Sequence, residues 1–209
     1  MKAVPLAVIA LTAGLLLVPL SPAQEKGEQT KPKQPASPQE QEMMKKWMQV
    51  ATPGEAHNKL NDLEGTWDVD MKIWEQGPGN PPTVSKGTSV KSWTVGHRFL
   101  REEYKGEMMG MPFDGLGYTG YDNYNKKYIG SWVDNTTTQM LTMSGVMDQP
   151  GKVLTLYGTM DEWMTGQNGE PVKYVTRVLS RDKHIFEVHN LALDGPNTLM
   201  MEATYTRKK

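Results

Sequence analysis

The sequence predicts an all-β protein: an antiparallel β-barrel of about 8–10 strands, preceded by one or two short N-terminal helices. First, apolar and polar residues alternate with a period of two from Glu64 onward, as in the segment 66–71. Second, turn residues separate roughly ten segments of strand composition between Glu64 and Arg207. Third, this region has no ten-residue amphipathic segment that predicts a crossover helix. Successive strands are therefore expected to pair antiparallel, and closing the sheet removes its exposed edges. A β-sandwich is the alternative arrangement.

Composition excludes several classes of function. The chain has 209 residues, with 23 Lys and Arg against 24 Asp and Glu, and it has no cysteine. A near-neutral charge without a basic cluster argues against nucleic-acid binding. The lack of cysteine excludes disulfides, thiolate metal sites and a lipid-anchored cysteine. The hydrophobic core must therefore hold the fold by itself.

Residues 1–23 have the layout of a secretory signal peptide. Lys2 precedes an apolar run over 3–20, and the small residues Ser21 and Ala23 fit a cleavage site before Gln24. An uncleaved membrane anchor is the alternative, but the run is barely long enough to span a bilayer. We therefore expect an exported, soluble protein, periplasmic or secreted, that does not contact the membrane after cleavage.

The mature chain divides into three parts. Residues 24–37 lack large apolar side chains and predict a disordered linker. Capping signals at Ser37–Glu40 and Thr52–Glu55 predict two helices within 38–63, the second over about 53–63. The barrel domain is expected over 64–207. The apolar face of the first helix is interpreted as packing, with partner binding as the alternative; it consists of Met43, Met44, Trp47 and Met48.

Turn chemistry divides the barrel region into strands. Gly, Pro, Asn and Asp supply the backbone conformations that tight turns need. The pair Asn168-Gly169 is a particularly strong hairpin signal. We predict turns at 77–82, 95–97, 106–112, 122–126, 134–136, 148–151, 166–170, 181–183 and 194–196.

Glycines also occur inside the predicted strands. Gly115 and Gly117 share a face with Phe113 and Tyr121, while Gly130 shares one with Trp132. Glycine in a strand indicates either a bend in the sheet or a close approach to the backbone. Both barrel curvature and aromatic stacking around a cavity are consistent with this pattern.

A series of motifs resembles a known family. Gly65-Thr66-Trp67 is similar to the start of lipocalin-like (calycin-type) barrels, in which this Trp commonly stacks under an Arg of the last strand. The resemblance implies that Trp67 and Arg207 form this structural closure. The segments 53–60, 63–67, 96–100, 104–113, 120–123 and 132–134 together resemble the bacterial family described as domain of unknown function 1579. The resemblance implies a lipocalin-like barrel and no particular activity.

The four histidines do not predict a metal or cofactor site. His57, His97, His184 and His189 lack the spacing of zinc ligands. His189 and Glu187 share a strand face and form either an acid–base unit or a surface pair. Haem bound through His184 or His189 is a further alternative. We expect no cofactor and no metal.

The methionine-rich segment Met108–Met111 is the one thioether cluster that could bind Cu(I) in an oxidising compartment. Methionine also fills irregular apolar space, and copper sites usually add histidine, which is not adjacent here. Core or cavity lining is therefore the favoured interpretation.

The expected function is binding of a small apolar or amphipathic molecule inside the barrel. No catalytic residue is predicted. One alternative is an enzyme with a polar site at the barrel mouth, formed by Arg98, Asp134, Arg177, Glu187 and His189. Another is a structural or partner-binding protein. The predicted cavity lining consists of Trp67, Phe113, Tyr121, Trp132, Tyr157, Tyr174, Phe186 and Met201.

Overall fold

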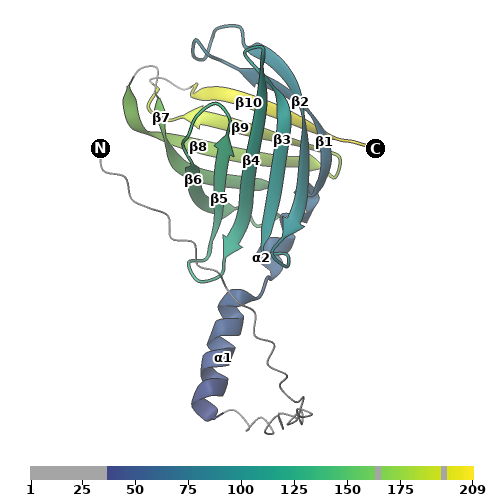
Figure 1. Cartoon of the computed structure of the whole chain (residues 1–209), viewed down its shortest axis with the longest axis vertical. Helices are drawn as coiled ribbons and strands as arrows, with labels where there is room; N and C mark the ends of the chain where they lie inside the picture. The colour runs from purple at the N-terminus through teal and green to yellow at the C-terminus, as the bar shows by residue number, and fades with distance from the viewer. Residues whose placement is uncertain (1–36, 163–165, 194–196) are drawn as a thin grey trace, which may run out of the picture. The chain divides into compact units, whose positions relative to one another are not determined.

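The computed structural model of the protein describes residues 37–162, 166–193 and 197–209 (Figure 1). The predicted signal peptide, 1–23, and all but the last residue of the predicted linker, 24–37, lie outside these residues. The described elements are α1 (Pro38–Ala51), α2 (Glu55–Asn58), the 3₁₀ helix η1 (Asn61–Leu63), β1 (Gly65–Ile73), β2 (Thr83–Thr94), β3 (Phe99–Met108), β4 (Met111–Asp122), β5 (Lys127–Asp134), β6 (Leu141–Met147), β7 (Val153–Glu162), β8 (Gln167–Ser180), β9 (Lys183–Asn190) and β10 (Leu199–Arg207).

The strands form a closed antiparallel barrel, as the alternating pattern predicted. Among the described residues ten strands follow one another around the wall, each paired with its neighbour in sequence. The first and last strands close the barrel, in register from Trp67 opposite Arg207 to Ile73 opposite Met201. Closure leaves no unpaired edge between β1 and β10, which accounts for a stable all-β fold without disulfides.

The second predicted helix is divided in two. The capping signal predicted at Thr52–Glu55 is displaced: Gly54 is the cap of α2, and its backbone N–H donates to Nδ1 of His57 at 3.1 Å. The chain then turns into η1. This arrangement places Leu60 and Leu63 inside one end of the barrel, where both are buried.

The packing interpretation of the first helix is wrong. Every residue of α1 from Pro38 to Val50 is exposed, including Trp47 at 58%. Leu60 and Leu63 belong to the hydrophobic core, whereas no residue of α1 does. The apolar face of α1 therefore lies in solvent.

Two predicted turns are also corrected. Gly106 does not begin a turn: β3 continues to Met108, and the hairpin is formed by Met109 and Gly110 at φ 54° and 75°. Asn168-Gly169 lies inside β8, where Gly169 at φ 71° accompanies a register shift in the pairing with β7. Both glycines serve the barrel wall, Gly106 by close approach and Gly169 by a bulge.

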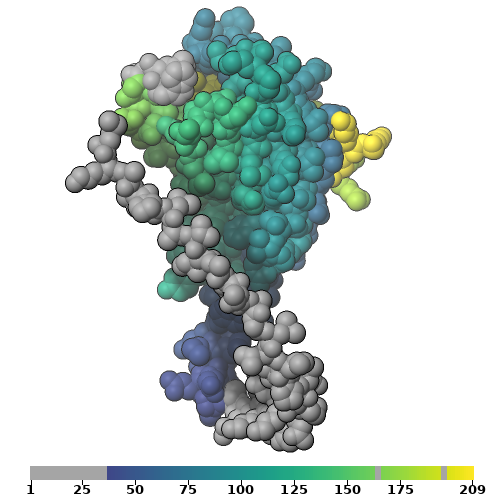
Figure 2. Space-filling model, viewed as in Figure 1, coloured from purple at the N-terminus to yellow at the C-terminus, as the bar shows by residue number. Residues whose placement is uncertain are grey.

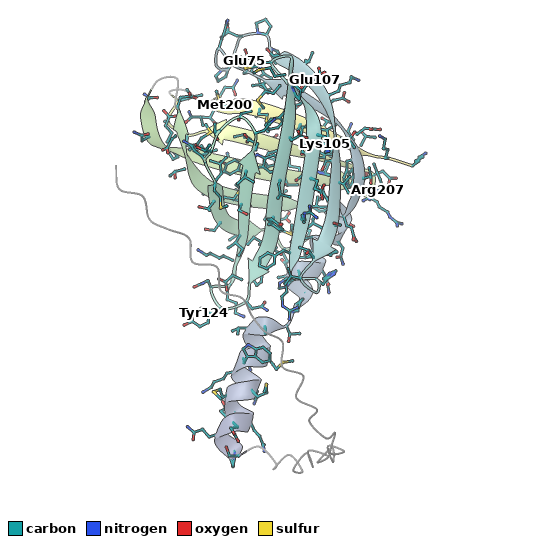
Figure 3. All side chains as sticks on the ribbon, viewed as in Figure 1. Glu75, Lys105, Glu107, Tyr124, Met200 and Arg207 are labelled. Atoms are coloured by element: carbon teal, nitrogen blue, oxygen red, sulfur yellow. The ribbon has the colours of Figure 1, made fainter. Side chains whose placement is uncertain are left out.

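The barrel has two different ends. We call the closed end the one at Leu60, Leu63, Trp67 and Arg207, next to α2 and η1. We call the rim end the other one, which includes Met108, the Met109–Gly110 turn, Asp134 and Met200. The two residues of β10 labelled in Figure 3, Met200 and Arg207, mark the two ends of that strand.

Candidate functional site

The barrel contains a cavity of about 340 Å³. Every strand contributes to its wall, and its lining extends from Leu63 at the closed end to Asp134 at the rim end. The side chains of the teal strands β3 to β5 cover it on the face shown in Figure 2. A volume of this size, mainly apolar with a few polar groups, is typical of sites for small molecules.

The cavity's apolar wall is built from alternate residues of each strand. Tyr174 of β8 and Phe186 of β9 stack with their ring centroids 6.2 Å apart. Burial raises the pKa of Tyr174 to about 12, so its hydroxyl stays neutral at physiological pH. Other apolar lining residues include Met71, Leu100, Phe113, Met143, Leu154, Leu156, Val188 and Met201.

Glycines allow two aromatic rings to lie flat against the wall. A Cβ at Gly87 would lie 2.2 Å from the Tyr104 hydroxyl, and a Cβ at Gly106 would lie 2.7 Å from it. A Cβ at Gly115 would likewise fall 2.1 Å from the Trp132 indole. Of the two interpretations made from the sequence, close approach therefore accounts for these positions. We call them the ring-seat glycines.

Four polar side chains meet on the inner wall beside the cavity, on β2, β3 and β10. Nζ of Lys91 lies 3.2 Å from Oε2 of Glu102. Oε1 of the same carboxylate accepts from Oγ of Ser89 at 2.7 Å and from the hydroxyl of Tyr205 at 3.2 Å. Burial, and secondarily the negative charge of Glu102, raises the pKa of Tyr205 well above its usual value. Tyr205 therefore remains a neutral donor.

His184 lies behind this polar cluster. Its Nε2 is 3.3 Å from Nζ of Lys91, and its ring stacks on Tyr205 at 4.3 Å. Burial lowers the pKa of His184 to about 2, helped by the positive charges of Lys91 and Arg207. Because the imidazole is then neutral, Nε2 accepts a hydrogen bond from the ammonium group.

Trp67 and Arg207 complete a stacked column at the closed end. The edge of His184 contacts Trp67, whose ring is fully buried, at a centroid distance of 4.4 Å. The Arg207 guanidinium lies 4.1 Å from the Trp67 ring on β1. It also donates to the backbone carbonyls of Asp62, Glu64 and Arg181. One side chain therefore joins β10, η1 and the β8–β9 turn.

The rim end carries a different set of contacts. Nε1 of Trp132 donates to Oδ2 of Asp134 at 2.9 Å, and both residues line the cavity. Met108 also lines the cavity, whereas Met109 and Met111 are 63% and 62% exposed. The methionines of segment 108–111 are thus divided between the cavity wall and the solvent.

A second, smaller cavity of about 300 Å³ lies at the closed end. His57, Arg98 and Tyr121 line it, together with the end of α1. Burial, and then the charges of His97 and Arg98, lowers the pKa of His57. Because Nδ1 of His57 already accepts from Gly54, this histidine serves the helix start.

Five of the eight residues predicted to line the barrel cavity line the main cavity. They are Phe113, Trp132, Tyr174, Phe186 and Met201.

The other three are corrected. Trp67 faces inward but lies beneath the main cavity, covered by His184 and Arg207. Tyr121 packs edge-on against His57 and borders the smaller cavity. Tyr157 is 51% exposed, because the inward residues of β7 are Leu154, Leu156 and Met160.

The sequence prediction missed Lys91, Glu102 and Tyr205. In β2 the alternation misleads, since Val90 is 44% exposed while Lys91 is buried. In β3 the signal was present: Glu102 shares its strand face with Leu100 and Tyr104. An acidic residue between apolar residues of the same strand face is therefore expected to point into the barrel.

The residues of the enzymatic alternative do not meet in a cavity. Arg177, Glu187 and His189 lie together on the outer face, with the Glu187 carboxylate 3.2 Å from Nε of Arg177 and 3.6 Å from Nε2 of His189. Arg98 is at the closed end and Asp134 at the rim end. Neither His184 nor His189, the two residues of the haem alternative, lines the main cavity. Among the described residues, this cavity therefore has no imidazole that could bind haem iron.

The fold and cavity define a closed antiparallel barrel with an internal binding-sized space. The family model described as protein of unknown function (DUF1579) matches residues 52–207. The chain therefore belongs to this family, as the motifs from Pro53 to Asp134 indicated. No curated protein matches the sequence.

Two solved structures are similar to this chain. The structure of Rv2717c from M. tuberculosis has a TM-score of 0.55 at 17% identity, covering 76% of this chain and all of that one. A redesigned beta barrel has a TM-score of 0.37 at 14% identity over the same share of this chain. The likeness to Rv2717c shows the barrel fold alone. Among the described residues, no helix is both long and apolar enough to cross a membrane.

Proposed function

We propose that the protein binds a small apolar or amphipathic molecule inside its barrel. The observation that supports this proposal is the cavity of about 340 Å³, whose wall combines apolar side chains with one ionic cluster. A core that only stabilised the fold would be packed to a density that leaves few voids larger than a water molecule. Empty apolar space of this volume weakens a core unless a ligand occupies it.

The direct test is titration with N-phenyl-1-naphthylamine, an uncharged probe that fluoresces in apolar surroundings. We expect saturable binding to the wild-type protein. Replacing Thr176, which lines the cavity, by Phe should abolish most of this signal by filling the space. Thr142→Phe adds the same side chain at an exposed position of β6 and should leave binding unchanged. Equal binding by both variants would contradict an internal site.

Native mass spectrometry of protein purified from its own source identifies the natural occupant. We expect a bound molecule of low mass that is released on unfolding. An unoccupied protein that also fails to bind the neutral probe would refute the proposal.

We further propose that the protein works after export, in the periplasm or outside the cell. The support is the predicted signal peptide over residues 1–23. N-terminal sequencing of the mature protein from a cell fraction should begin at Gln24. A cytoplasmic product that retains residues 1–23 would contradict export.

A second candidate function is partner binding through α1. Met43, Met44, Trp47 and Met48 are 65%, 56%, 58% and 48% exposed, an apolar face that costs free energy in water. Changing Met44 and Trp47 to Ser should leave the unfolding midpoint unchanged while removing any such interaction. A marked loss of stability would instead indicate that this face packs within the protein.

A further inference from the structure

The polar part of the cavity wall carries a fixed set of charges. Lys91 and Glu102 both line the cavity, and their side chains are only 8% and 20% exposed. Water cannot screen such poorly exposed charges well. A polar ligand group beside them must therefore complement their charge and their hydrogen-bonding capacity.

The ammonium group of Lys91 is fully engaged within the wall. One side contacts the Glu102 carboxylate at 3.2 Å, and another contacts Nε2 of His184 at 3.3 Å. A third faces the ring of Tyr205 at 4.3 Å from its centroid. An ammonium has three N–H donors, so the existing contacts leave no donor for a ligand carboxylate.

The carboxylate of Glu102 retains capacity. Its Oε1 accepts from Ser89 and Tyr205, while Oε2 contacts Lys91. A carboxylate has about four acceptor positions. One acceptor position of Oε2 therefore remains for a ligand that donates an O–H or N–H.

The remaining charge on the lining also disfavours anions. Asp134 lies at the rim end of the same cavity. Among the described lining residues, the ammonium of Lys91 therefore stands against two carboxylates. An anionic ligand would meet net negative charge along the cavity and leave its own charge unpaired.

From these contacts we propose that the cavity takes an uncharged amphipathic molecule whose polar head donates a hydrogen bond to Glu102, such as a medium-chain alcohol, and rejects the corresponding carboxylate. The inference rests on the proposed binding function and adds its ligand class. The apolar tail would lie against Phe186 and the methionines toward the rim end.

The test compares three ligands with the same ten-carbon chain by displacement of N-phenyl-1-naphthylamine at pH 7.5. We expect 1-decanol to bind at least threefold more tightly than 1-methoxydecane, which lacks the donor, and at least tenfold more tightly than decanoate. Decanoate binding as tightly as 1-decanol would overturn the proposal.

A charge-removing variant tests the same inference from the protein side. Glu102→Gln leaves Lys91 without its counter-ion, so the preference should shift toward decanoate by at least tenfold. Glu103→Gln, at the next and exposed position of β3, should leave the ranking unchanged. An unchanged ranking in folded Glu102→Gln would overturn the proposal, and the wild-type ranking decides it if that variant does not fold.

The two proposals fail in different ways. If the neutral probe does not enter the barrel, the binding function falls and the ligand class with it. The probe could instead bind the wild-type protein and be excluded by Thr176→Phe, while 1-decanol, 1-methoxydecane and decanoate bind equally tightly. That result would refute the proposed ligand class and leave the proposed binding function standing.

Discussion

The two ends of the barrel are built by different means. At the closed end, Trp67 is fully buried between Arg207 and His184, and the guanidinium donates to three backbone carbonyls. At the rim end, the corresponding strand ends carry half-buried or exposed side chains such as Met108 and Met109. We expect stability to be concentrated at the closed end, which would leave the rim end freer to admit a ligand.

Trp67→Ala should have the largest effect. It removes a fully buried indole together with the surface on which Arg207 lies. We expect the free energy of unfolding to fall by about 3–5 kcal/mol, measured by urea denaturation. A loss below about 1 kcal/mol would show that the closed end is not the stable one.

Gly115→Ala tests the wall near the rim end. The added methyl would overlap the Trp132 indole and force it toward the cavity. We expect a loss of about 1–3 kcal/mol in stability, together with weaker binding of the neutral probe. Gly110→Ala, in the open hairpin turn, adds the same methyl with nothing within 4 Å. Its φ of 75° costs some stability, but the cavity wall is unchanged, so probe binding should stay intact.

His184 predicts a pH dependence of stability. The pKa of His184 is about 2 in the folded protein and about 6.5 in the unfolded chain. Below pH 6.5 the unfolded chain therefore binds a proton that the folded protein does not bind, and this favours unfolding. The stabilisation of the folded state by neutral His184 is fully present above pH 6.5 and is lost as the pH falls below that value. Between pH 7.5 and 5.5 it should cost about 1.4 kcal/mol, measured by urea denaturation. In folded His184→Gln, the decline over this range should be smaller by that amount; an identical decline would contradict the prediction.

The smallest effect is expected in the hairpin turn of the rim end. Met109 adopts φ 54°, a left-handed conformation that asparagine tolerates better than methionine. Met109→Asn should raise the free energy of unfolding by about 0.5 kcal/mol. Thermal unfolding of this variant beside Met111→Asn, whose backbone lies in β4, should show the gain only at position 109.

Much of the fold followed from the sequence because the strands and the turns between them depend on local signals. Turn residues divided the chain into strands, and the motif at Gly65–Trp67 led to the partner at Arg207. Turn positions failed where glycine served another purpose: Gly106 is a ring-seat glycine, and Gly169 belongs to a bulge. Glycine composition alone does not distinguish a turn from a close approach.

The candidate site was less predictable, since residue type was taken as a guide to direction. Tyr157 is aromatic but faces outward, while Lys91 is charged but faces inward. In a barrel, the strand face sets direction, and the face is fixed by register with both neighbours. Register between distant strands, such as Val69 of β1 opposite Tyr205 of β10, is a property of the closed fold.

The placement of the tryptophans gives the protein its own optical reporters. Trp47 lies in water, Trp67 is sealed in the stacked column, and Trp132 borders the cavity. An indole emits at shorter wavelength in apolar surroundings than in water, so these three environments have separable spectra. Variants that keep one indole at a time would report separately on the exterior, on melting of the stacked column and on occupancy, without any attached dye.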